Sequence, residues 1–115
     1  MIQIIIWNTR GLGARVKTDF LAMEIKKYKV CIIVVLEHKQ HKSKIKNFSQ
    51  KLKMHASMHA DPENHHIWIF WKRDMAVDLV KAGDQYITVN VNMGGDFLFI
   101  SFVHGSCDEQ WRECL

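Results

Sequence analysis

Two continuous apolar segments constrain the possible fold of this chain more than any other feature. The first runs from Ile2 to Trp7 and includes three consecutive isoleucines, and the second runs from Val30 to Leu36. A strand with one face in water would alternate apolar and polar residues, whereas these segments are apolar at almost every position. Both are therefore predicted to be strands covered on both faces, inside a sheet.

The residues between these segments predict how the two strands are connected. Ala14 to Tyr28 carries apolar side chains at close to the 3.6-residue spacing of an amphipathic helix. A strand, a helix and a strand within about 35 residues form a βαβ unit, whose two strands are parallel. Asn8 and Glu37 follow the two apolar segments, so they are predicted to lie at one sheet edge, where open α/β sheets place ligands.

A polar, glycine-rich turn follows the first apolar segment. Arg10 comes directly after Asn8 and Thr9, and Gly11 and Gly13 follow it. Glycine allows the backbone to approach a ligand closely. This strand end is therefore a candidate phosphate-binding or metal-binding corner.

The rest of the chain has the pattern of a short helix followed by an antiparallel meander. A helix is expected within Gln40 to Lys53, and the weaker alternation of Met54 to Ala60 is compatible with a strand. Turn residues separate the strands that follow. Those strands are expected at Ile67–Trp71, Met75–Val80, Tyr86–Val91 and Phe97–Val103, and the tail Asp108–Leu115 is compatible with the start of a helix. The expected class is α/β or α+β, with one mixed sheet and helices on one face.

Two motifs resemble a known family. Ile6 to Gly13 and Val35 to Lys39 resemble the opening of the endonuclease/exonuclease/phosphatase superfamily, and more narrowly the endonuclease domain of plant LINE-type (non-LTR) retrotransposons. Those domains typically begin with a serine-tryptophan-asparagine-x-arginine-glycine-leucine-glycine turn and continue with a leucine-x-glutamate-threonine-lysine strand end. Three later segments resemble strands of the same elements, namely Ile67–Trp71, Gly83–Thr88 and Phe102–Ser106.

The resemblance implies a four-layer α/β sandwich of which this chain would be a part. Such a domain is roughly twice as long as this chain, so residues 1–115 are expected to form a single truncated domain, the N-terminal half. In the whole fold the two halves stack sheet against sheet, so one sheet face would be uncovered here. The candidates for exposed aromatic residues, and for self-association through them, are Trp68, Phe70, Trp71, Phe97 and Phe99.

The resemblance also implies a chemistry, the hydrolysis of a phosphodiester bond with Mg²⁺ or, in its place, Mn²⁺. Glu37 and Asn8 match the residues that bind the metal, and both, with His104, are the catalytic candidates. One or two protein carboxylates suffice for Mg²⁺, which keeps several waters, so weak binding is expected. His104 stands where the family usually has tyrosine, and His38 stands where it has threonine.

The sequence lacks the family's later motifs, which supply the general acid and base. Each positioned proton-transfer group contributes about 10²–10⁴-fold to the rate. Hydrolysis by this chain alone is therefore expected to be negligible. The seven histidines give only a weak pattern for a transition-metal site, because His55 and His59 are four residues apart in a segment that resembles a strand.

The net charge of +4 and the concentration of lysines in one part of the chain favour a polyanionic partner. Nucleic acid, and DNA in particular, is the expected partner. The candidate contacts are Arg10, Lys39, Lys42, Lys44 and Lys46. The alternative is that the lysines simply form a solvated helix face. A small, basic, non-enzymatic domain that binds nucleic acid or protein therefore stays open as the second interpretation.

Composition and patterning exclude several classes of protein. With 48% hydrophobic and 24% charged residues the chain has a globular composition. No apolar run approaches the roughly 20 residues that a membrane span needs, and no secretory signal pattern is present. The expected location is intracellular, in the nucleus or cytoplasm. Cys31, Cys107 and Cys114 predict neither a disulfide framework nor a zinc site.

Overall fold

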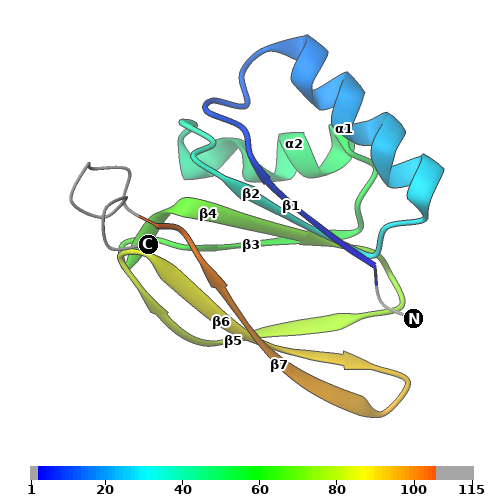
Figure 1. The fold of residues 1–115 in the computed structure, drawn as a ribbon, viewed down its shortest axis with the longest axis vertical. Coiled ribbons are helices and arrows are strands. Elements are labelled where there is room, and N and C mark those ends of the chain that lie inside the picture. The colour runs from blue at the N-terminus through cyan, green and yellow to red at the C-terminus, as the bar shows by residue number, and fades with distance from the viewer. Residues whose placement is uncertain (1–2, 106–115) are drawn as a thin grey trace.

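The computed structural model describes residues 3–105, which form two stacked β-sheets with helices over the outer face of one of them (Figure 1). The first part of the chain comprises β1 (Ile4–Asn8), α1 (Arg15–Tyr28), β2 (Ile32–Leu36), the 3₁₀ helix η1 (Lys42–Lys44) and α2 (Ile45–Lys51). The second part comprises β3 (Ala56–Ala60), β4 (Asn64–Trp71), β5 (Ala76–Gly83), β6 (Tyr86–Met93) and β7 (Asp96–Val103).

The predicted βαβ unit is present at the start of the chain. β1 and β2 pair in parallel, with Ile4 opposite Ile32 and Asn8 opposite Leu36. Between them, α1 buries Leu21 and Ile25 and ends at Lys29. Lys29 adopts a left-handed conformation, with φ 52°, and its N–H donates to the carbonyl of Ile25, which is a common way to end a helix.

The four strands β1-β2-β4-β3 form a mixed sheet, hereafter the helix-covered sheet. β2 lies at its centre, parallel to β1 and antiparallel to β4, and all five of its residues are buried. Ile33 and Val35 pack in the layer beneath the helices, whereas Ile32 and Val34 pack in the layer between the two sheets. This burial on both faces explains why the segment is apolar at every position.

The strands β5-β6-β7 form a second, wholly antiparallel sheet, hereafter the outer sheet. The α+β class and the mixed sheet with helices on one face are confirmed, but the meander does not extend that sheet as expected. Alternate residues of β6, Ile87, Val89 and Val91, are buried against the helix-covered sheet. A strand with one apolar face can cover a sheet on one side, but it cannot occupy a position that is buried on both sides.

The aromatic residues predicted to be exposed fall into two groups. Trp68, Phe70 and Trp71 are buried, so that part of the prediction was wrong. Trp68 and Phe70 pack beneath the helices, and Trp71 packs between the sheets, where the outer sheet supplies the missing cover. Phe97 and Phe99 are 64% and 67% exposed, as predicted, on the strand β7.

Two other expectations concern the helices. The helix expected within Gln40 to Lys53 is present, as η1 and α2, which together cover Lys42 to Lys51. The tail from 108 to 115, with Cys107 and Cys114, lies outside the described residues. Within residues 3–105, no helix has the length and apolar character required to cross a membrane.

Candidate functional site

Asn8 and Glu37 lie at the same edge of the helix-covered sheet, as the two apolar segments predicted. Asn8 is the last residue of β1 and lies opposite Leu36, the last residue of β2, so Glu37 is the next residue of the neighbouring strand. The amide of Thr9 donates to the carbonyl of Leu36 over 3.0 Å, and its hydroxyl donates to the same carbonyl over 3.2 Å. The two strand ends are thereby tied together.

The glycine-rich turn after β1 packs against the loop after β2. Gly11 has φ +104°, a conformation that favours glycine, and its N–H donates to the carbonyl of Glu37 over 2.7 Å. The Nζ atom of Lys17 donates to the carbonyls of Thr9 and Gly11 over 2.7 and 2.9 Å. The conformation that glycine permits therefore directs the Gly11 amide at the loop after β2, and Arg10 beside it stays exposed.

The backbone of Glu37 is held in an unusual conformation. Its φ is +51°, in the left-handed region that non-glycine residues rarely adopt. Its N–H donates to the carbonyl of His66 on β4 over 3.0 Å. The chain thus leaves β2 through a sharp, hydrogen-bonded turn, and the Glu37 side chain stays 27% exposed.

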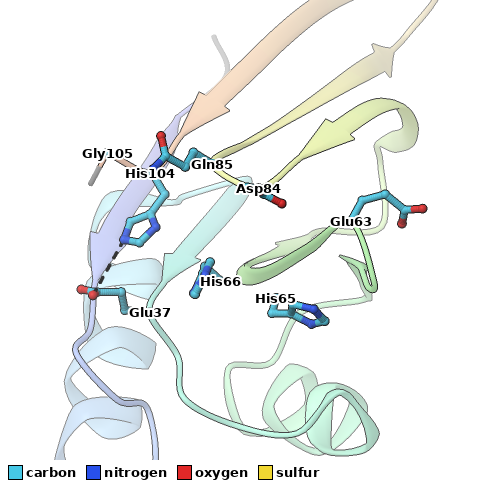
Figure 2. Close-up of a pocket in the computed structure, with 8 residues that line it drawn as sticks. All are labelled: Glu37, Glu63, His65, His66, Asp84, Gln85, His104 and Gly105. Atoms are coloured by element: carbon cyan, nitrogen blue, oxygen red, sulfur yellow. Dashed lines mark ion pairs between the residues drawn. The ribbon is translucent and has the colours of Figure 1, made fainter. Parts of the chain in front are cut away.

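Glu37 lines a cavity of about 310 Å³ where the two sheets meet (Figure 2). The cavity walls come from the end of β2, from the start of β4, from the turn between β5 and β6 and from the residues after β7. The lining residues are Glu37, Glu63, His65, His66, Asp84, Gln85, His104 and Gly105. The mixture of carboxylates and imidazoles makes it a polar cavity that suits a charged ligand.

His104, which directly follows β7 of the outer sheet, lines the same cavity as Glu37. Its backbone N–H donates to the carbonyl of Gln85 over 2.6 Å, and Figure 2 shows its ring directed at Glu37. The Nε2 atom of His104 lies 3.8 Å from Oε1 of Glu37, which is beyond hydrogen-bond distance. This nitrogen is buried and has no hydrogen-bond partner in the described structure. The ring of His66 lies nearby, with the two ring centroids 5.2 Å apart.

His38 anchors the loop that follows Glu37. Its ring is 3% exposed and stacks on Trp68 with 3.8 Å between the ring centroids. Its Nδ1 atom accepts a hydrogen bond from the amide of Gln40 over 3.0 Å. Burial disfavours the charged form and lowers the pKa of His38 from 6.5 to about 4, although the His65 backbone and Asp61 oppose this shift. His38 is therefore neutral near pH 7 and keeps the loop packed on the core.

The residues at this edge suit a weak, water-rich cation site. Glu37 offers a partly exposed carboxylate that lines the cavity. Asn8 does not line the cavity, and its Oδ1 atom accepts a hydrogen bond from the amide of Arg10 over 3.2 Å. Within residues 3–105, no three His, Cys, Asp or Glu side chains are arranged to hold a metal ion. Mg²⁺ needs only one or two protein oxygens, with waters completing its shell, so the oxygen donors present fit that ion.

The predicted nucleic-acid contacts lie outside the cavity. Lys42, Lys44 and Lys46 are exposed on η1 and α2, and Lys39 is exposed on the loop that leads to them. The stem of Lys39 lies close to Gly11, next to Arg10. These five cations therefore belong to the loops and helix that continue from the Glu37 edge, and none of them lines the cavity itself.

Sequence reasoning did not identify His66 as a residue of this edge. The available signal was its position directly before the apolar run of β4. Since β4 runs antiparallel to β2, the start of β4 meets the end of β2. Gln85 and Asp84 could not be found in this way, because their approach depends on how the outer sheet stacks.

No protein-family profile and no curated protein matches the sequence. Among solved structures, the chain is similar to D. rerio TDP2, determined in complex with a single-strand DNA product. The two chains are 11% identical and superpose with a TM-score of 0.61. The superposition covers 98% of this chain and 52% of the TDP2 chain. The present chain therefore spans about half the length of the structure it matches. The likeness shows that the two chains share a fold, and at this identity it shows the fold alone.

Proposed function

We propose that this chain is the metal-binding part of a Mg²⁺-dependent phosphodiesterase that acts on nucleic acid, of the retrotransposon endonuclease type. The observation that carries the proposal is the meeting of Glu37 and His104 from different sheets at one polar cavity, with Asn8 at the same sheet edge. An endonuclease/exonuclease/phosphatase fold with a carboxylate at this strand end suits phosphodiester chemistry.

Each of these side chains has a specific role in the proposal. Glu37, together with Asn8, would hold Mg²⁺, or Mn²⁺ in its place. When bound, the ion supplies positive charge that stabilises the charge developing on a phosphate. His104 would donate a hydrogen bond from Nε2 to a phosphate oxygen. Its shielded position, with the side chain 14% exposed, would strengthen that hydrogen bond relative to one in bulk water.

Hydrolysis by residues 1–115 alone should be slow. The motifs that supply the general acid and base in the resembled family are absent from this sequence. Each such group typically contributes about 10²–10⁴-fold, so a bound ion alone would leave much of the barrier. We expect activity to require these groups from a further segment or chain.

DNA is the proposed substrate class. The solved structure with the same fold holds a single-strand DNA product, and the exposed cations Arg10, Lys39, Lys42, Lys44 and Lys46 continue from the Glu37 edge. Contacts of this kind neutralise phosphates without reading bases, so we expect little sequence preference. A DNA substrate is consistent with the expected location in the nucleus or cytoplasm.

Calorimetric titration with Mg²⁺ tests the metal part of the proposal. Wild type should bind weakly, and Glu37→Gln should abolish detectable binding because it removes the only negative charge assigned to the ion. Glu63→Gln is a matched control, since Glu63 lines the same cavity on an exposed turn. Equal Mg²⁺ affinity in wild type and Glu37→Gln would show that the site is assigned wrongly.

Binding of a single-stranded oligonucleotide tests the DNA part. The double variant Lys42→Ala/Lys44→Ala should bind more weakly, and its salt slope should fall by about 0.7 for each lost phosphate contact. Lys26→Ala/Lys27→Ala removes the same charge from the end of α1 and should have a smaller effect. An affinity that does not change between about 50 and 200 mM salt would exclude phosphate contacts.

The second candidate function is a basic interaction domain without catalysis. It is favoured by the exposed lysines and by the exposed Phe97 and Phe99 on the outer sheet, which also support the proposed self-association. Two results together would favour this alternative. The wild-type chain would bind no Mg²⁺, and oligonucleotide binding would be unchanged in Glu37→Gln. Sedimentation of Phe97→Ser/Phe99→Ser against wild type tests whether that face drives association.

A further inference from the structure

We propose that a basic groove beside α2 holds a segment of single-stranded nucleic acid and leads it to the end of the sheets opposite Glu37. Three adjoining cavities form this groove, and their walls come mainly from α1, from α2 with the loop after it, and from the loop after β4. The inference rests on the proposed function for the class of ligand. It adds a second group of phosphate contacts to those already assigned near the Glu37 edge.

The three cavities adjoin because they share lining residues. The first, of about 360 Å³, begins at Lys46 and shares Met54 and His55 with the second, of about 640 Å³. The second shares Lys53 and Lys72 with the third, of about 370 Å³. The seven residues of α2 rise about 10 Å along the groove, and a stacked strand advances about 3.4 Å per nucleotide. The groove therefore has room for roughly three nucleotides or more.

Backbone hydrogen bonds fix the loops at the far end of the groove. The amide of His55 donates to the carbonyl of Trp71 over 2.9 Å, and the amide of Lys72 donates to the carbonyl of Cys31 over 3.1 Å. Lys53 has φ 58° and turns the chain away from α2. The loops before β2, before β3 and after β4 therefore meet here, and Lys53 and Lys72 line the same two cavities.

The groove carries far more positive than negative charge. The cations that line it are Lys26, Lys46, Lys53, Lys72 and Arg73. Among the described residues that line the three cavities, Asp74 alone carries a carboxylate. None of the ion pairs within residues 3–105 involves any of these cations. The cavity at Glu37 contains three carboxylates instead. Cations without a protein partner can neutralise phosphates, so this groove suits a polyanion.

The groove also offers surfaces to bases, which favours a single strand over a duplex. The imidazole of His55 is exposed and lines both the first and the second cavity. The third cavity is lined by apolar side chains, among them Met23 and Leu52. Unpaired bases can stack on a ring or contact an apolar surface, whereas the paired bases of a duplex are stacked on one another. Phosphates at the lysines and bases in the cavities are thus compatible.

Fluorescence anisotropy with a labelled oligothymidylate of about 15 nucleotides, a length within known single-strand site sizes, tests the phosphate contacts on the whole chain. Lys53→Gln/Lys72→Gln should weaken binding roughly fivefold or more and lower the salt slope by about 1.4, which is about 0.7 for each lost contact. Lys27→Gln/Lys81→Gln is the matched control, because both lysines are exposed and neither lines the groove. It should change the affinity by less than about twofold, since salt screens distant charges.

Two results would overturn the phosphate contacts. One is wild-type affinity in Lys53→Gln/Lys72→Gln, and the other is an equal loss in Lys27→Gln/Lys81→Gln. The melting curves of both variants should match the wild type, so that a loss of binding reports the contacts and not the fold.

An abasic oligonucleotide of the same length tests the contact with bases. His55→Ala should weaken binding of the oligothymidylate by about fivefold, the low end for the loss of one stacked base. It should leave binding of the abasic strand unchanged. Equal losses for the two ligands, or no loss for either, would overturn the assignment of the groove to single-stranded nucleic acid.

The outcomes separate this inference from the proposed function. Weaker binding in Lys53→Gln/Lys72→Gln, with none in Lys42→Ala/Lys44→Ala, would support the groove and overturn the DNA contacts proposed near Glu37. The reverse result would overturn the groove and leave those contacts in place. Calorimetric Mg²⁺ binding by Lys53→Gln/Lys72→Gln should equal that of wild type, because neither lysine lines the Glu37 cavity.

Discussion

The helix-covered sheet and the outer sheet differ in how completely this chain buries them. β2, at the centre of the helix-covered sheet, is buried along its whole length, with α1 and α2 on one side and the outer sheet on the other. The outer sheet buries one face only, and β7 leaves Phe97 and Phe99 largely in water. The stability of the fold should therefore depend on the first sheet much more than on the free face of the second.

The largest expected contrast is between two phenylalanines. Phe70 is fully buried beneath the helices, so Phe70→Ala should lower the free energy of unfolding by about 3–5 kcal/mol. Phe99 is 67% exposed, so Phe99→Ala should cost less than about 1 kcal/mol. Chemical denaturation of both variants measures the contrast. Comparable losses in the two would mean that the free face of the outer sheet is covered in solution.

The buried side chain of Asn64 links the two sheets by hydrogen bonds. The Nδ2 atom of Asn64 donates to the carbonyl of Gly83 over 2.9 Å and lies 3.3 Å from that of Tyr86, while its Oδ1 atom accepts from the amides of His66 and Ile67. Asn64→Ala leaves several partly buried groups unpaired and should destabilise the chain by about 1–3 kcal/mol.

The Asn64 contacts cross from β4 to the turn between β5 and β6, so hydrogen exchange in that turn should accelerate more than exchange in β2. Asn92→Ala is the control, because Asn92 makes one exposed hydrogen bond within a turn. Uniform acceleration across both sheets would show that they do not open separately.

Acid should destabilise the helix-covered sheet through His38. The unfolded ring takes up a proton near pH 6.5, whereas the pKa of the folded ring is about 4. The stabilising contribution is therefore complete above pH 6.5 and is lost as the pH falls toward 4, by about 2 kcal/mol at pH 5.

His38→Gln should remove this part of the pH dependence, and His41→Gln, which alters an exposed ring, should retain it. Denaturation midpoints between pH 5 and 7.5 provide the measurement. A His38→Gln variant with the wild-type pH dependence would contradict the assignment.

The same contrast between the sheets explains what could be predicted from the sequence. The apolar segments that became β1 and β2, with the helix between them, predicted a parallel pair and the common edge of Asn8 and Glu37, because these features depend on local patterns. The burial of Trp68 and the separate outer sheet depend on pairing and stacking between distant strands. His66 reaches Glu37 through the pairing of β4 with β2, for which its position before the apolar run of β4 was a signal. The approach of His104 to Glu37 depends on the stacking of the two sheets, which no local pattern reveals.

Paramagnetic broadening by Mn²⁺ tests most directly the claim that the cation site lies where the two sheets meet. In a spectrum with assigned amides, trace Mn²⁺ should first broaden the signals of Glu37, His66 and His104 and then that of Asn8. Glu37→Gln should abolish this broadening. Broadening that begins at the opposite end of the sheets, around His55 and Lys72, or that persists unchanged in Glu37→Gln, would contradict the account.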